Sequence, residues 1–197
     1  FSVFGIAGIS YLVWIPAVFM RVHGWTASDI GLAYGAILLL TSVPGVFVGG
    51  WISDRLTTRG RVDAPITVAA MVMFALVPLV LVTPLHPDPT TALTLLAVTS
   101  FGFGMLNGLP GTALQSVVPN QLRGQIIAAY FLIGTMMSLG SWPTLVAWVS
   151  DHLLGGPMQI GVSLATVGAV ATLASATMLW VSRTGFREAV EVARQWR

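Results

Sequence analysis

Six apolar stretches, each about as long as a lipid bilayer is thick, constrain this chain more than any other feature. A helix needs roughly 20 apolar residues to cross the hydrocarbon core of a membrane. The windows that meet this requirement cover residues 1–20, 29–53, 65–84, 91–115, 124–149 and 158–182. Charged residues make up only 8% of the sequence, whereas a soluble domain carries about 25%. The sequence therefore predicts an all-α membrane protein with six transmembrane helices.

The basic residues predict the direction in which these helices cross the membrane. All nine of them are arginine, and all except Arg21 fall on one side of a six-span arrangement. Because basic loops stay in the cytoplasm, both ends of the chain are expected there, as the even number of spans also requires. We expect a multi-pass protein of the plasma membrane, in a bacterium the inner membrane. The formal net charge of +2 is too small to indicate a nucleic-acid partner.

A short phrase that occurs twice indicates an internal repeat. The sequence reads WISD at 51–54 and WVSD at 148–151, in each case at the end of an apolar stretch. Three spans separate the copies, so the second must emerge on the opposite side of the membrane from the first. This pattern is typical of the inverted repeats of secondary transporters. It predicts repeats over 1–84 and 91–182, followed by a cytoplasmic amphipathic tail over 183–197.

Small residues at four-residue spacing predict where helices approach one another closely in lipid. The pairs are Gly31/Gly35, Gly45/Gly49, Gly104/Gly108 and Gly134/Ser138.

The loop between the second and third spans carries a family resemblance. Its sequence, GWISDRLTTRGR at 50–61, resembles the cytoplasmic signature loop of the major facilitator superfamily. The matching residues are Gly50, Asp54, Arg55, Arg59 and Arg61, although the Gly-Arg-Arg part of the family pattern is stretched here. In that family the loop follows the second span of each six-helix half. The resemblance thus implies half of such a transporter over the whole chain, with the other six-helix half as its partner.

Two further features concern which half this is. The chain begins at Phe1 inside an apolar run, and an arginine-rich segment follows Ser182. Both favour a fragment that corresponds to the C-terminal half. The stretch LQSVVPNQLRG at 114–124 is similar to spinster-like and organic-anion-type members of the family.

The signature loop has an expected role. Asp54 should face a positive group, either Arg55, Arg59 or the N-terminus of a neighbouring helix, because a carboxylate is unfavourable at a helix C-terminus. The resemblance implies that the loop latches the two halves together on the cytoplasmic side. Arg123 would then receive the loop of the other half. For both Asp54 and Arg123 the alternative is an ordinary cytoplasmic anchor.

Polar and aromatic side chains within the spans are candidates for a substrate cavity, because such groups need partners or water in lipid. In the family, the first and fourth helices of each half line the cavity. The candidates are Tyr11, Trp14, Asn107, Gln115, Tyr130 and Trp142. For Asn107 the alternative is a hydrogen bond between helices.

These features together favour a secondary transporter that moves a small organic solute by alternating access. No cysteine is present, and we find no nucleophile motif or metal-ligand pairing, so neither an enzyme nor a cofactor is expected. A self-contained six-helix channel or receptor is the alternative function. The candidates carry no charge, which favours a neutral or amphipathic solute. No charged residue lies well inside a span, so any residue that couples transport to an ion is expected in the other half.

Overall fold

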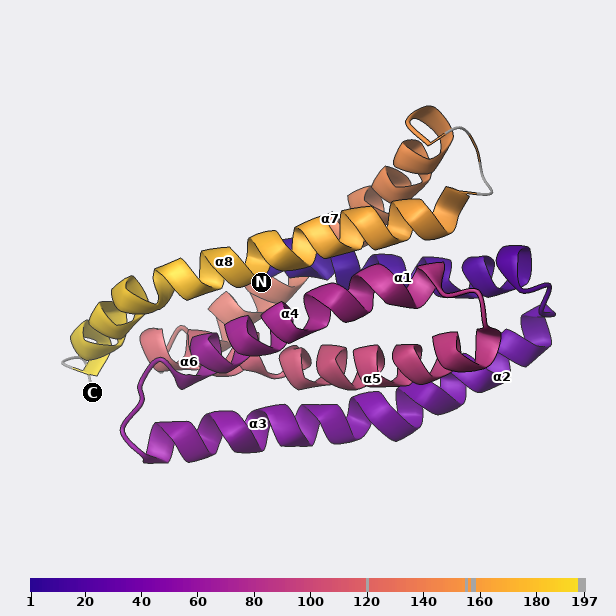
Figure 1. Cartoon of the computed structure of the whole chain (residues 1–197). Coiled ribbons are helices and arrows are strands. Elements are labelled where there is room, and N and C mark those ends of the chain that lie inside the picture. Colours follow the sequence, from indigo (N-terminus) through magenta and orange to yellow (C-terminus); the bar gives the residue numbers. More distant parts are fainter. Residues whose placement is uncertain (120, 155, 157–158, 195–197) are drawn as a thin grey trace.

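The helices of the chain form one elongated bundle (Figure 1). The computed structural model describes residues 1–119, 121–154, 156 and 159–194, with the backbone alone over 137–142. Within these residues it contains helices and no strand. The helices are α1 (Ser2–Val22), α2 (Ala27–Ile37), a π-helical segment η1 (Leu38–Ser42), α3 (Val43–Thr58), α4 (Ala64–Val82), a 3₁₀ turn η2 (Thr83–Leu85), α5 (Pro89–Asn107), α6 (Leu109–Val117), α7 (Arg123–His152) and α8 (Ile160–Arg194).

These elements combine into rods that match the six apolar windows. The segments α2, η1 and α3 follow one another directly, as do α4 with η2 and α5 with α6. Five rods are long and apolar enough to cross a membrane within the described residues. The remaining one, α7, has 30 residues and includes positions 137–142. The predicted all-α membrane fold is confirmed.

Local sequence signals explain where several helices begin. At the start of α2, the Thr26 hydroxyl accepts a hydrogen bond from the Asp29 backbone at 3.2 Å, and the Asp29 carboxylate accepts one from the Thr26 backbone. At the start of α5, the Asp88 carboxylate accepts a hydrogen bond from the Thr91 backbone at 2.7 Å. These side chains satisfy backbone donors that the first helical turn leaves unpaired. Both caps follow loops at the same end of the bundle, so polar residues mark that end.

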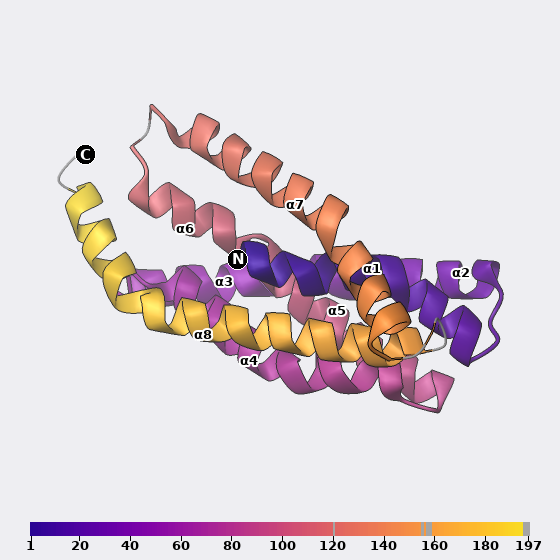
Figure 2. The same cartoon turned by 90° about the horizontal axis from the view of Figure 1, so that it is seen from above.

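The helices pack in a pattern that occurs twice. The first helix, α1, packs against α7 and α8, and the corresponding helix of the second set, α5, packs against α3 and α4. The last helices of the two sets, α4 and α8, pack against each other along the bundle (Figures 1 and 2). Each of these contacts made by a helix of the first three rods thus has a counterpart made by the corresponding helix of the last three. The packing is that of a three-plus-three repeat.

The duplicated phrase occupies equivalent environments in the two sets. Ser53 and Ser150 are both buried, whereas Trp51 and Trp148 are both exposed. The α3 and α7 helices that carry the phrase end at opposite ends of the bundle (Figure 1). The phrase therefore pairs a small inward-facing residue with an outward-facing aromatic one at each end.

Glycine permits the closest helix contact in the bundle. A methyl group at Gly45 or Gly49 of α3 would overlap backbone carbonyl oxygens of α5, and one at Gly104 of α5 would overlap the Ser42 carbonyl. In contrast, Gly31 and Gly35 face open space within this chain, as do Gly108 and Gly134. Only part of the predicted small-residue pattern is thus used for packing inside the bundle.

The last helix is longer than the predicted span. It runs without interruption from Ile160 to Arg194, so the tail expected after Ser182 prolongs the span rather than forming a separate element. Its length is 35 residues, or about 52 Å at 1.5 Å per residue. On this extension Val190 and Ala193 are buried and Glu188 is exposed, as an amphipathic pattern predicts. Trp196, at the end of that pattern, lies outside the described residues.

Candidate functional site

A cavity of about 460 Å³ lies between four of the rods. Its walls come from α1, from the α2–η1 segment, from α5 with the start of α6, and from α7. The lining residues are Phe1, Ser2, Phe4, Gly5, Gly8, Ile9, Leu12, Tyr34, Leu38, Ser42, Ser100, Phe103, Leu106, Asn107, Pro110, Tyr130, Phe131, Gly134 and Thr135. No Asp, Glu, Lys, Arg or His side chain occurs among these residues. Cavities of roughly 300–1,000 Å³ hold small organic ligands, so this one has room for such a molecule.

The π-helical segment forms one edge of the cavity. It places Leu38 and Ser42 in the wall, and the Ser42 hydroxyl donates to the Ser100 carbonyl of α5 at 3.1 Å. The close approach that Gly104 permits brings the two backbones together at this point. Single-turn π-helical segments within α-helices are frequent at functional sites. The geometry thus joins two walls of the cavity by a direct polar contact.

A break in the next rod sets the position of Asn107. The helix α5 ends at this residue, Gly108 interrupts the rod, and α6 begins at Leu109 with Pro110 in its first turn. Proline provides no backbone N–H and favours such a start. The Asn107 side-chain nitrogen donates to the Phe103 carbonyl at 3.2 Å, within its own helix. Its amide oxygen forms no hydrogen bond within the described residues.

The structure brings together some of the residues predicted to line a cavity. Asn107 and Tyr130 lie in the wall. Tyr11 does not; it is fully buried behind the wall, and its hydroxyl donates to the Val80 carbonyl of α4. In a regular helix the Val80 carbonyl would accept a hydrogen bond from the backbone N–H of residue 84, but that residue is proline and has no N–H. The Tyr11 hydroxyl donates to this carbonyl instead.

The other predicted cavity residues lie elsewhere. The Trp14 ring nitrogen donates to the Pro143 carbonyl at 3.0 Å and thereby ties α1 to α7. Gln115 is exposed on α6 and is not a lining residue. The side chain of Trp142 lies outside the described residues. Neither Trp14 nor Gln115 contributes to the wall of the cavity.

Tyr34 is a cavity residue absent from the predicted set. Its side chain is 6% exposed and lines the cavity from α2, and its hydroxyl has no hydrogen-bond partner within the described residues. The available sequence signal was a tyrosine well inside an apolar span. That signal does not reveal which side of the helix the ring occupies.

The signature-loop residues lie together at the end of α3. Asp54, Arg55, Arg59 and Arg61 are exposed, and the Arg55 guanidinium lies 5.2 Å from the centre of the Trp51 ring. Among the described residues Asp54 forms no ion pair, and Gly50 beside it faces open space. Arg123, at the start of α7, donates to the Val118 carbonyl at 3.3 Å. The Asp54 carboxylate is thus exposed without an ion pair in the part of the chain that the structure describes.

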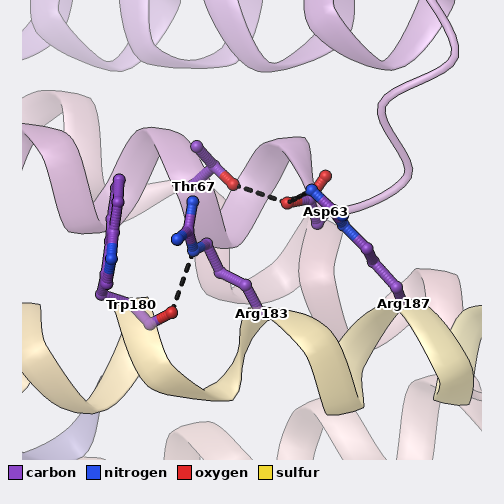
Figure 3. A network of polar contacts seen from close by, with 5 residues as sticks. All are labelled: Asp63, Thr67, Trp180, Arg183 and Arg187. Carbon is purple, nitrogen blue, oxygen red and sulfur yellow. Dashed lines mark hydrogen bonds and ion pairs between the residues drawn. The ribbon is translucent and has the colours of Figure 1, made fainter.

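A polar network holds the α3–α4 loop to the extension of α8 (Figure 3). The Asp63 carboxylate accepts hydrogen bonds from Arg187 and from the Thr67 hydroxyl, each at 2.9 Å. Asp63 is 1% exposed, whereas Arg187 is 48% exposed. Burial alone would raise the pKa of the Asp63 carboxyl, but the two hydrogen bonds and the arginine charge together hold it below its ordinary value. This buried carboxylate was not singled out by the sequence.

A second arginine continues this network along α8. The Arg183 guanidinium lies 3.3 Å from the centre of the Trp180 ring, and its Nε donates to the Trp180 carbonyl at 2.9 Å. The Trp180 ring in turn meets Phe74 of α4 edge-on, with 6.1 Å between the ring centres. The Trp180–Phe74 contact thus joins α8 to α4, whereas both Arg183 contacts lie within α8 (Figure 3).

The fold and cavity define a multi-pass α-helical membrane protein of the transporter class. Residues 1–141 match the family model of the Major Facilitator Superfamily. The chain belongs to this superfamily.

Similar proteins agree with this family. The chain is 25% identical over 193 residues to an "MFS-type efflux pump" of Mycolicibacterium smegmatis, a match that covers 95% of the chain and 44% of the relative. A bacterial homologue of the human lysosomal transporter Spinster, solved in an inward-facing and unoccupied conformation, matches the whole chain. The TM-score is 0.70 at 18% identity, and 47% of that structure is covered.

The occupied, also inward-facing, structure of a bacterial Spinster homologue gives a TM-score of 0.65 at 17% identity. That match covers 96% of the chain and 47% of the solved structure. The chain therefore spans less than half the length of the relatives it matches. It has the fold of one half of a transporter of this superfamily.

Proposed function

We propose that this chain is the C-terminal six-helix half of a secondary transporter that moves a small organic solute by alternating access. The observation that carries the proposal is the uncharged cavity, whose walls come from α1, α2, α5 and α7. A site between two bundles that rock against each other needs such a cavity on the face that the bundles share. The second bundle would close the open side of the cavity.

The signature loop supports the same arrangement. Asp54 is exposed and lacks an ion pair within the described residues, although it lies near the C-terminal end of α3, where a carboxylate is unfavourable. The positive end of a helix dipole, at a helix N-terminus of the second bundle, would then face the Asp54 carboxylate. The arginine-rich loops would then lie in the cytoplasm, in a bacterium on the inner face of the plasma membrane.

Alternating access can be tested without knowledge of the substrate. The chain contains no cysteine, so a cysteine introduced at Thr135, in the cavity wall on α7, would be its sole thiol. In the complete transporter, with any cysteines of the other half replaced, a membrane-impermeant maleimide should label this position when added on either side. The control is Thr177→Cys on the exposed surface of α8, which is expected to face lipid and to remain unlabelled from both sides.

Labelling of the Thr135→Cys variant from one side only, under every condition, would argue against alternating access. A cross-link between the two halves that traps one conformation should abolish labelling from the closed side. If the cross-link leaves labelling from both sides intact, the cavity is not gated between the halves.

A further inference from the structure

The composition of the cavity wall indicates what kind of molecule the cavity accepts. Phe4 and Phe103 meet edge-on with 5.4 Å between ring centres, and Tyr11 supports Phe103 from behind at the same separation. The Phe4 and Phe103 rings form an apolar wall that runs from α1 to α5. Aromatic walls of this kind favour planar or otherwise apolar bodies, which they contact edge-on or in offset stacks.

The polar groups that line the cavity are uncharged. The Ser42 hydroxyl is already bonded to the Ser100 carbonyl, and the Asn107 nitrogen to the Phe103 carbonyl. The hydroxyls of Tyr34 and Tyr130 have no partner within the described residues, and neither has the amide oxygen of Asn107. Each of these three residues lines the cavity, as do Ser2, Ser100 and Thr135, whose hydroxyls likewise have no partner within the described residues. Together they leave five hydroxyl groups and one amide oxygen available to a ligand.

The absence of charge among the lining residues in the described part of the chain limits the ligand further. A charged group moved from water into an apolar cavity without a counter-charge loses much solvation energy. Neutral hydrogen-bonding groups lose far less, and the unpaired hydroxyl and amide groups can replace their water contacts. The wall of this half is therefore suited to an uncharged molecule.

We propose that the cavity binds an uncharged solute with a planar aromatic body and one or two hydrogen-bonding groups, which contact the Tyr34 hydroxyl and the Asn107 amide oxygen. This inference rests on the proposed transporter function, because it assigns a ligand class to the same cavity. Tyr34 contributes to specificity, since its ring is buried while its hydroxyl remains unpaired. A ligand that fails to bond to this hydroxyl leaves it unsatisfied.

Two matched fluorescent probes test the ligand class. N-phenyl-1-naphthylamine is uncharged and has one N–H donor, and 8-anilinonaphthalene-1-sulfonate has the same aromatic body with an added anion. Binding of each to the transporter in lipid nanodiscs is measured by titration of fluorescence, with empty nanodiscs as the blank. The neutral probe should bind at least tenfold more tightly than the sulfonate. Equal affinities, or tighter binding of the sulfonate, would overturn the inference.

Conservative variants test the residues. Tyr34→Phe removes only the unpaired hydroxyl and should weaken binding of a neutral naphthol probe, 1-naphthol, about fivefold, the loss expected for one hydrogen bond. Tyr11→Phe removes a hydroxyl that is bonded to Val80 behind the wall, and it should leave the affinity unchanged. Equal effects of the two variants would overturn the assignment of Tyr34.

A substitution that should increase the affinity for one probe provides a further test, because a damaged protein would not bind more tightly. Thr135→Arg places a cation in the wall and should increase the affinity for the sulfonate while that for the neutral probe changes little. If the sulfonate gains nothing, the probes bind outside this cavity and the inference fails. These measurements detect binding alone. If selective binding is found but labelling shows no alternating access, the ligand class stands and the transporter function is refuted.

Discussion

The buried carboxylate of Asp63 forms an ion pair with Arg187, which lies 124 residues away in the sequence. If this ion pair stabilises the bundle, Asp63→Asn should lower the free energy of unfolding by about 1–2 kcal/mol. This figure is the value of a charged hydrogen bond reduced for the solvent exposure of Arg187. Unfolding in a mixed detergent series, followed by circular dichroism, would measure it. Glu188→Gln, an exposed neighbour of Arg187, should have little effect.

Pairwise substitution would separate the ion pair from other effects. In a double-mutant cycle with Arg187→Met, the two changes should cost less together than the sum of their separate costs. Additive costs would mean that the contact contributes no stability.

The lowered pKa of Asp63 also predicts how stability depends on pH. The folded chain holds this carboxyl ionised to a lower pH than the unfolded chain does. The stabilisation is therefore present in full above the ordinary aspartate pKa of about 3.9, and it is lost as the pH falls through the lower folded value. The Asp63→Asn variant should show a smaller loss of stability over that acid range. An unchanged acid profile would contradict the assignment.

At the scale of elements, the contact between α3 and α5 depends on glycine. Gly49→Ala should push the two helices apart, because the added methyl would overlap the backbone of Met105. We expect a loss of about 1–3 kcal/mol, which is typical of overpacking, measured by the same unfolding series. The matched control is the adjacent Gly50→Ala, where the methyl meets open space and the helix gains propensity. Equal stability of the two variants would show that the contact between α3 and α5 accommodates the added methyl group.

The positions of the rods could be predicted from the sequence, but their rotations could not. A run of apolar residues is visible in one dimension, so all six windows correspond to helical rods. Whether a side chain faces a cavity depends on rotation about the helix axis, and the surface of a helix in lipid is apolar all round. For this reason the predicted residues Asn107 and Tyr130 lie in the wall of the cavity, Tyr34 lies there although the sequence does not predict it, and Tyr11 lies behind the wall.

Two other features had no local signal. The sequence Leu-Leu-Leu-Thr-Ser at 38–42 is compatible with an ordinary α-helix, and its π-helical form accompanies a contact with a helix that follows much later in the chain. The Asp63–Arg187 ion pair likewise joins distant segments. Such features arise from tertiary packing, so composition and periodicity do not reveal them.

At the scale of the whole molecule, the expected orientation can be tested with the same cysteine-free background. Thr58→Cys at the end of α3 and Thr90→Cys at the start of α5 lie at opposite ends of the bundle (Figure 1). In intact cells, an impermeant maleimide should label only the Thr90→Cys variant. After the cells are opened, both variants should react. Labelling of the Thr58→Cys variant from outside would reverse the proposed orientation.

The uninterrupted length of α8 has a mechanical consequence. The helix packs against α1 and α4 within the bundle, and the ion pair between Asp63 and Arg187 fastens its extension to the α3–α4 loop. For a rod of about 52 Å, a tilt of about 10° carries one end through about 9 Å relative to the other. In the proposed transport cycle, the extension would therefore turn a slight tilt of the bundle in the lipid into a larger displacement at the membrane surface.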